Sequence, residues 1–164
     1  MNITFQGNQV TLEGTPVKVG DQAPDFVAKD NDLNDVSLKD TTGKRVFVVV
    51  PSVDTPVCDM EVRRFNQEAT ALGDVTVYVV SMDLPFAQAR WCGAKGIEKV
   101  KLLSDYKDRS FGQNYGVYVK ELGLLTRAVF VIDANGKVTY AEYCNEITSE
   151  PNYEEVLKAI NQLG

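Results

Sequence analysis

The segment Val46-Phe-Val-Val-Val50, followed by Pro51-Ser-Val-Asp-Thr-Pro-Val-Cys58, decides how this chain folds. The first five residues are all apolar, which is typical of a central strand buried on both faces. Beyond Cys58 the apolar residues recur at helical spacing; they are Val62, Phe65, Ala69 and Leu72, and Gly73 follows as a helix stop. The sequence therefore predicts a buried strand that turns directly into a helix, with Cys58 in its first turn.

The predicted helix start gives Cys58 a reactive setting. Thr55 fits the N-cap and Pro56 the first helical position, so Cys58 is the third helical residue, beside the capping hydroxyl. The unpaired N–H groups and the positive end of the helix dipole favour a thiolate, the reactive form of cysteine. The Thr55 hydroxyl hydrogen is free to point at the sulfur or at a substrate oxygen. Asp59 and Glu61 oppose a thiolate, so a cation must help.

Length, composition and charge narrow the class of protein. The 164 residues, 44% hydrophobic and 24% charged, fit one globular domain spanning 1–164. A formal net charge of −6 argues against nucleic acid or an anionic membrane as partner. No apolar run reaches the length of a membrane span. The first residues lack the pattern of a secretion signal, so we expect a cytoplasmic protein.

The cysteine and histidine counts narrow the chemistry. Three scattered cysteines, Cys58, Cys92 and Cys144, are too few for a disulfide scaffold. The chain has no histidine, which removes the base that Cys–His and Ser–His catalysis require and the usual ligands of a structural zinc site. A nucleophile must then be activated by the helix dipole, hydrogen bonds and cations.

The remaining elements indicate an α/β fold. Val75–Val80 is a second buried strand, and strand–helix–strand implies a parallel pair. Further expected elements are an N-terminal hairpin extension within 1–15 that turns around Gly7-Asn8, strands near Phe26–Ala28, Val36–Leu38 and Val100–Leu103, a helix over Leu84–Cys92 that stops at Gly93, a hairpin of Arg127–Asp133 and Lys137–Tyr143, and a C-terminal helix from Tyr153. Together they predict a thioredoxin-like fold, a central mixed sheet flanked by helices, with an N-terminal β-hairpin extension.

Several strings in the chain resemble one enzyme family. Pro51-x-x-x-Thr55-x-x-Cys58 is similar to the peroxidatic signature of peroxiredoxins. The strings that look like the thiol peroxidase branch, the atypical 2-Cys peroxiredoxins, are Phe5-Gln-Gly-Asn, Pro51-Ser-Val-Asp-Thr55, Ser81-Met-Asp-Leu-Pro-Phe-Ala-Gln-Ala-Arg90, Cys92-Gly-Ala and Arg127-Ala-Val-Phe-Val-Ile-Asp133. The similarity spans nearly the whole chain in the same order.

The resemblance implies an antioxidant enzyme that reduces hydrogen peroxide and organic hydroperoxides. Cys58 would attack the O–O bond and become a sulfenic acid, and Cys92 would resolve it to an intramolecular disulfide that thioredoxin reduces. Arg127 matches the family's active-site arginine, and Pro51 matches the residue that shields the sulfur from solvent. The resemblance also implies a homodimer. No metal or other cofactor is expected, because two thiols carry both electrons.

Other interpretations of the cysteines and of the enzyme class are possible. Cys92 alone could be core filler, Arg90 could be surface charge, and Cys144 matches no role beyond packing. A thiol–disulfide oxidoreductase would normally present C-x-x-C, but Glu61 stands at that position. A redox sensor would be oxidised once without turnover. For the peroxidase, we expect the reduced form to hold the two sulfurs apart, so that the helix ends around Cys58 and Cys92 must open for resolution.

Overall fold

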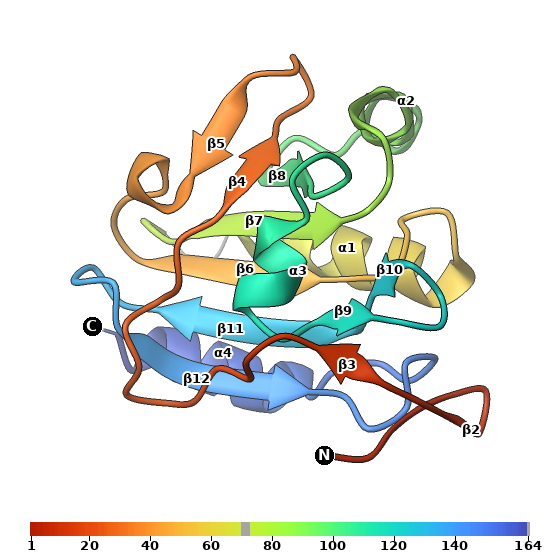
Figure 1. Cartoon of the computed structure of the whole chain (residues 1–164). Helices are drawn as coiled ribbons and strands as arrows, with labels where there is room; N and C mark the ends of the chain where they lie inside the picture. Colours follow the sequence, from red (N-terminus) through yellow and green to blue (C-terminus); the bar gives the residue numbers. More distant parts are fainter. Residues whose placement is uncertain (70–72, 164) are drawn as a thin grey trace.

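A mixed sheet forms the centre of the molecule. The computed structural model describes residues 1–69 and 73–163, and these form a seven-stranded sheet (Figure 1). Its strands, in spatial order, are β12 (Val138–Tyr143), β11 (Ala128–Ile132), β6 (Arg45–Val49), β7 (Thr76–Ser81), β8 (Val100–Ser104), β4 (Val27–Lys29) and β5 (Asp35–Ser37). The predicted central strand is confirmed as β6, one residue earlier than expected, and it lies inside the sheet between β11 and β7.

The three strands β6, β7 and β8 run parallel to one another. Val46 pairs with Val77, and Val79 pairs with Leu102. Helix α1 (Pro56–Ala69) connects β6 to β7, and α2 (Pro85–Lys95) connects β7 to β8. Because strands in this register end at the same edge of the sheet, the starts of α1 and α2 are neighbours there. The strands β11 and β4 join this parallel unit in antiparallel orientation.

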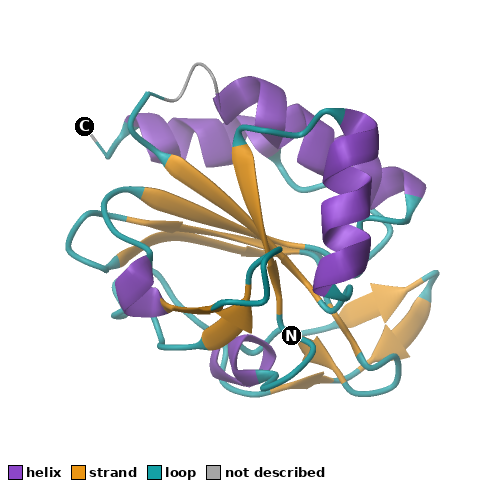
Figure 2. Ribbon diagram, turned by 90° about the horizontal axis from the view of Figure 1, so that it is seen from above, coloured by secondary structure: helices purple, strands orange, loops and turns teal. Residues whose placement is uncertain are grey.

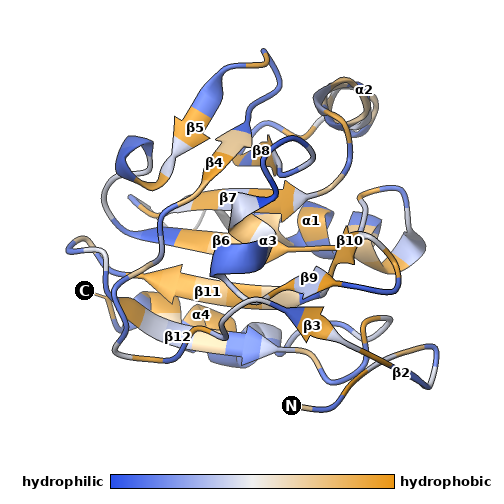
Figure 3. Ribbon diagram, viewed as in Figure 1, coloured by the Kyte–Doolittle hydropathy of each residue, from blue (hydrophilic) through white to orange (hydrophobic). Residues whose placement is uncertain are grey.

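Helices cover both faces of the sheet. In Figure 1, α1 and α4 (Tyr153–Asn161) lie behind the sheet, and the short α3 (Ser110–Asn114) lies in front of it. Figure 2 shows the longer helices on one side of the strands and short helical segments, α3 and the 3-10 turn η1 (Leu38–Asp40), on the other. All five residues of β6 are buried, and Figure 3 shows hydrophobic colour concentrated on the central strands. Burial on both faces explains why the residues of this strand after Arg45 are apolar without alternation.

Each face of the sheet has its own apolar cluster. Behind the sheet, valines of β6 and β7 pack with Cys58, Val62 and Phe65 of α1 and with residues of α4. Trp91 and Cys92 of α2 pack against this same cluster. In front, the opposite side chains of the same strands pack against an aromatic group that includes Phe26, Phe111 and Tyr115. The two thiols of interest therefore belong to one face.

The N-terminal hairpin extension is confirmed, with a small change in position. Strands β1 (Ile3–Phe5) and β2 (Asn8–Val10) pair through a turn at Gln6 and Gly7, both with positive φ, as a tight hairpin turn requires. Leu12 does not continue the hairpin. It belongs to β3 (Leu12–Glu13), in a small sheet with β9 (Tyr118–Val119) and β10 (Leu124–Leu125).

The sequence predicted two helix ends, and the structure corrects the end of α2. Helix α2 does not stop at Gly93 but continues to Lys95 and ends at Gly96, which has a left-handed φ of +65° and donates its N–H to the Cys92 carbonyl. Cys92 therefore lies inside the helix rather than at its end. The predicted last turn of α1 at Leu72 lies outside the described residues.

Candidate active site

The turn from β6 into α1 places Cys58 as the sequence predicts. Thr55 Oγ1 accepts a hydrogen bond from the Cys58 backbone N–H at 3.2 Å, and the Thr55 carbonyl accepts from the Asp59 N–H at 2.9 Å. Thr55 is thus the N-cap, Pro56 the first helical residue and Cys58 the third. The Cys58 side chain is fully buried, and so is Pro51 at the start of the turn. The Cys58 sulfur is therefore held at the positive end of the helix and away from bulk water.

Arg127 provides the cation that the sequence required without locating it. Its Nη2 lies 3.1 Å from Cys58 Sγ. The residue directly precedes β11, the neighbour of β6 in the sheet, which brings it to the helix start. Its Nε donates to the Ile147 carbonyl at 2.7 Å, and only 2% of the residue is exposed. A buried guanidinium fixed at a second point in this way holds its charge at the sulfur.

Glu61 is the site residue whose role the sequence reading missed. Its Oε2 accepts from Arg127 Nη1 at 2.5 Å, and the side chain is fully buried. Glu61 lies three residues after Cys58, and residues at this spacing share one face of a helix. It therefore orients Arg127 rather than simply opposing the thiolate. The signal available in the sequence was this spacing, together with the need for a cation.

The electrostatics of the Arg127–Glu61 pair follow from its burial. Burial raises the pKa of Glu61 to about 7, against the opposing effect of Arg127. Burial alone would lower the pKa of Arg127, but the charges of Glu61 and Cys58 outweigh it, so its pKa is raised. Arg127 thus stays cationic. Because Glu61 titrates near neutrality, the charge that Arg127 offers to the sulfur is only partly neutralised there.

Asp59 and Glu61 contact different partners. Its Oδ1 accepts from Trp91 Nε1 at 3.0 Å, and its Oδ2 lies 3.4 Å from Arg63 Nη2. Trp91 directly precedes Cys92, and Asp59 directly follows Cys58. This hydrogen bond therefore joins α1 to α2 beside both cysteines.

The Thr55 hydroxyl is oriented away from the sulfur in this state. It donates to the Ser52 carbonyl at 3.3 Å while accepting from the Cys58 N–H. Of the two orientations that the sequence left open, toward the sulfur or toward a substrate oxygen, the first is not adopted here. Thr55 acts by fixing the backbone of the turn.

Cys92 lies on α2 as a half-buried thiol. Burial raises its pKa, and a hydrogen bond from the Asn31 side chain opposes this rise only in part. Cys92 is therefore not suited to be the first nucleophile. All three cysteines are free thiols, so the structure is that of the reduced protein.

Cys144 is buried and directly follows β12. Burial, reinforced by Glu142, raises its pKa to about 12. Its N–H donates to the Arg127 carbonyl at 3.0 Å, so its backbone holds that of Arg127 directly before β11. This setting matches the packing role that the sequence suggested.

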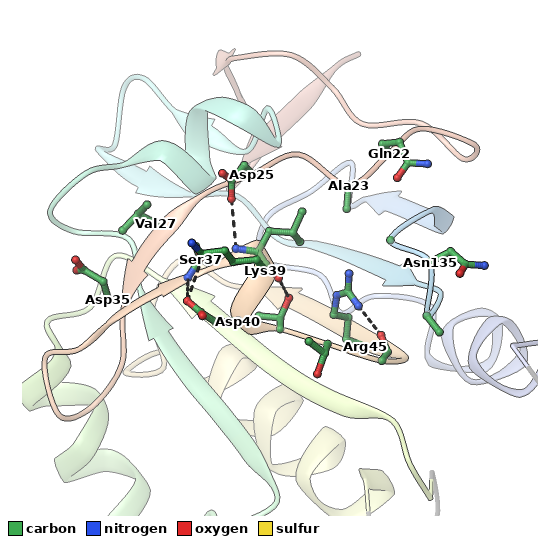
Figure 4. Close-up of a pocket in the computed structure, with 16 residues that line it drawn as sticks. Gln22, Ala23, Asp25, Val27, Asp35, Ser37, Lys39, Asp40, Arg45 and Asn135 are labelled. Atoms are coloured by element: carbon green, nitrogen blue, oxygen red, sulfur yellow. Dashed lines mark hydrogen bonds between the residues drawn. The ribbon is translucent and has the colours of Figure 1, made fainter.

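Two cavities adjoin the site, and a larger one lies elsewhere. A cavity of about 200 Å³ is lined by Thr55, Pro56, Asp59 and Trp91, among others. A second, of about 430 Å³, lies between residues 52–54 and α2 and includes Arg90. A third cavity, of about 810 Å³, is lined by Arg45 among others (Figure 4). Arg45 begins β6 whereas Cys58 follows its end, so this cavity lies at the opposite edge of the sheet from the thiol.

The part of the chain that the structure describes contains neither a membrane-spanning helix nor a metal-binding cluster. Within residues 1–69 and 73–163, no helix is both long and apolar enough to cross a membrane. Over the same ranges, no group of three or more His, Cys, Asp or Glu side chains is placed to hold a metal ion.

Comparison with known proteins identifies close relatives. The family model described as Redoxin matches residues 18–157. The chain is 60% identical to the thiol peroxidase of Clostridium acetobutylicum over 159 residues, covering 97% of both chains. It is also 60% identical to the thiol peroxidase of Bacillus subtilis over 162 residues, covering 98% of this chain and 97% of that one. Among solved structures, a peroxiredoxin-like protein from Aquifex aeolicus superposes with a TM-score of 0.93 at 42% identity, covering 99% of this chain and 97% of that chain.

Proposed function

Because the chain belongs to the redoxin family and, within it, to the thiol peroxidases, we propose that Cys58 is the residue with which it reduces hydroperoxides. Thiol peroxidase activity makes the protein an antioxidant enzyme. The assignment of roles to particular side chains is our proposal. It includes Thr55, Arg127 and Pro51 around the nucleophile and Cys92 as the second thiol.

One observation supports the choice of Cys58 more than any other. A fully buried sulfur lies 3.1 Å from the guanidinium of Arg127, at the N-terminus of a helix. Hydrogen bonds and charges in a buried site are stronger than in water, so both features stabilise a thiolate. Neither of the other two cysteines has such a setting, because burial raises the pKa of both.

In the first step the Cys58 thiolate attacks the terminal oxygen of the hydroperoxide. The S–O bond forms as the O–O bond breaks, and the leaving oxygen takes a proton to become water or an alcohol. Sulfur is oxidised to sulfenic acid and the peroxide is reduced, with two electrons transferred. The Arg127 charge stabilises the thiolate before attack and the negative charge that moves onto the oxygens during it. Pro51 and the Thr55-capped turn keep water away from the sulfur.

In the second step Cys92 resolves the sulfenic acid. Its sulfur attacks Cys58 Sγ, the S–S bond forms, and the sulfenic oxygen leaves as water. Both residues pack on the same apolar cluster, which favours this pairing. Because Cys92 lies inside α2 and Cys58 is buried, the helix segments around them must open first. We propose that thioredoxin then reduces the disulfide by thiol exchange.

The oligomeric state, cellular location and cofactor requirement of the enzyme can each be tested. We propose a homodimer that works in the cytoplasm, with no metal or other cofactor in the cycle. Sedimentation of the reduced protein and fractionation of the cells that make it test the first two points. Full activity after exhaustive chelation tests the third.

A coupled assay tests the whole cycle. Purified protein is mixed with thioredoxin, thioredoxin reductase and NADPH, and NADPH consumption is followed after adding hydrogen peroxide or an organic hydroperoxide. We expect sustained turnover, abolished in Cys58→Ser and retained in Cys144→Ser. Oxidation that stops after one equivalent would indicate a redox sensor instead. Faster reduction of insulin than of peroxide would indicate a thiol–disulfide oxidoreductase, although Glu61 at the C-x-x-C position is already engaged with Arg127.

A further inference from the structure

Asp83 connects the loop before Cys58 to the start of α2. It belongs to residues 82–84, which link β7 to α2 within the string Ser81-Met-Asp-Leu-Pro-Phe-Ala87. Figure 1 shows this link between the two elements. Its Oδ1 accepts from Ser52 Oγ at 2.7 Å, and its Oδ2 accepts from the Val53 N–H at 2.8 Å. One carboxylate thus holds two consecutive residues of the Pro51–Thr55 turn. We propose that Asp83 is a positioning residue for Cys58, an inference that rests on the function proposed above.

A continuous chain of hydrogen bonds leads from Asp83 to Cys58. The carboxylate fixes Ser52, whose carbonyl accepts from the Thr55 hydroxyl at 3.3 Å and from the Thr55 N–H at 3.4 Å. Thr55 Oγ1 in turn accepts from the Cys58 N–H at 3.2 Å. A shift of Ser52 therefore moves the N-cap, and a shift of the N-cap moves the sulfur relative to Arg127.

Asp83 can hold the turn because it is itself held by the centre of the sheet. Its Oδ2 also accepts from Ser81 Oγ at 2.8 Å, and its backbone carbonyl accepts from Ser104 Oγ at 2.5 Å. The fully buried Gln88 donates from Nε2 to Ser81 Oγ at 3.1 Å and to the Leu103 carbonyl at 2.9 Å. Ser81 and Ser104 end the central strands β7 and β8. The turn is thus connected through Asp83 to the ends of two central strands of the sheet.

This arrangement separates the two halves of α2. The residues from Asp83 to Gln88 are tied to the sheet by these bonds, whereas Gly93, Ala94 and Lys95 near the other end of the helix are exposed. Opening of the Cys92 half for resolution can therefore leave the Asp83 contacts in place. The peroxide step, rather than opening of the Cys92 half, is then the step that depends on Asp83.

The experiment compares Asp83→Ala with a matched control. Asp83→Ala leaves the Val53 N–H buried without an acceptor, and a backbone N–H cannot turn to find another. The control is Asp105→Ala. The Asp105 carboxylate likewise accepts two backbone N–H groups, those of Phe111 and Gly112, but it has no contact with the turn. Both variants are made with Cys92→Ser, so that only oxidation of Cys58 is followed, by mass after rapid quenching.

We expect Asp83→Ala to slow the second-order oxidation of Cys58 by about tenfold or more, because small misplacements of a reacting atom are costly. Asp105→Ala should lower the melting temperature but leave this rate unchanged. Asp83→Asn should restore the rate, since its Oδ1 accepts from Val53 and its Nδ2 donates to Ser52. A normal rate in Asp83→Ala, or equal slowing in Asp105→Ala, would overturn the role of Asp83.

A milder variant guards against misfolding of Asp83→Ala. Ser52→Ala removes one of the two hydrogen bonds to the turn, and we expect about threefold slower oxidation. An unchanged rate here would also count against the proposal. The Cys92→Ser parent separates the two hypotheses: if it is not oxidised at Cys58, the proposed function fails, whereas normal oxidation of the parent and of the Asp83 and Ser52 variants alike refutes only the role of Asp83.

Discussion

Replacing Arg127 by glutamine removes the guanidinium charge that lies directly at the sulfur. The wild-type guanidinium contacts Cys58 Sγ at 3.1 Å, Glu61 Oε2 at 2.5 Å and the Ile147 carbonyl at 2.7 Å. Glutamine is shorter and neutral, so the contact with a thiolate is lost together with its charge. The substitution therefore tests whether this contact drives the reaction with peroxide.

The size of the effect follows from the type of contact. A hydrogen bond to a charged group contributes about 1.5–3 kcal/mol. Since each 1.36 kcal/mol changes a rate tenfold, we expect Arg127→Gln to lower the second-order rate constant with hydrogen peroxide by about 10- to 150-fold. Stability should fall as well, because removing one partner of a buried ion pair costs about 3–5 kcal/mol. Protonation of Glu61 limits this cost, since burial already raises its pKa to about 7.

A double variant separates rate from stability. Glu61→Gln combined with Arg127→Gln removes the buried carboxylate along with the cation, so unfolding in urea should show recovered stability. Stopped-flow measurement of single-turnover oxidation should still show the slow rate. A wild-type rate in Arg127→Gln, or a rate that recovers together with stability in the double variant, would refute the role given to Arg127.

Three further results are expected. Cys92→Ser should consume one equivalent of peroxide and then fail to cycle on thioredoxin; normal cycling would transfer the resolving role to Cys144. Amide exchange around Cys58 and Cys92 should be faster in the disulfide form than in the reduced form, and identical protection would contradict local opening. The folded pKa of Glu61 exceeds its usual 4.5, so its contribution to stability is present below pH 4.5 and is lost as the pH rises through 7. Wild type should therefore lose about 3 kcal/mol relative to Glu61→Gln between these limits, measured by urea unfolding, whereas a constant difference would show that Glu61 does not titrate there.

Local patterns in the sequence predicted most of the fold correctly. The apolar run Val46–Val50 predicts a buried strand, and the pair Thr55-Pro56 predicts a helix start. Both predictions need only these residues, because burial and helix capping act over a few residues. The predicted end of α2 was wrong, also because of a local effect. A glycine in a helix costs only about 1 kcal/mol, so Gly93 did not stop the helix, and the left-handed Gly96 did.

Contacts between distant segments were harder to predict. Gly116 has a φ of +65°, and a Cβ there would lie 2.7 Å from the Thr15 backbone, so the strands around it depend on a close approach that no local pattern encodes. The same holds for the site. The sequence required a cation, and resemblance supplied Arg127, but the buried pairing with Glu61 depends on how β11 lies beside β6. The Asp83 contacts likewise join segments that are 30 residues apart or more.

The most direct test of the account is the product formed by the reduced protein with limiting hydrogen peroxide. Intact mass and peptide mapping after alkylation give both the number of thiols lost and their identity. We predict that the protein loses two hydrogens and that Cys58 and Cys92 form the single linked peptide pair. Cys144 should remain a free thiol and therefore be alkylated. A stable oxygen adduct or linkage at Cys144, with Cys58 still a free thiol, would contradict the proposed chemistry.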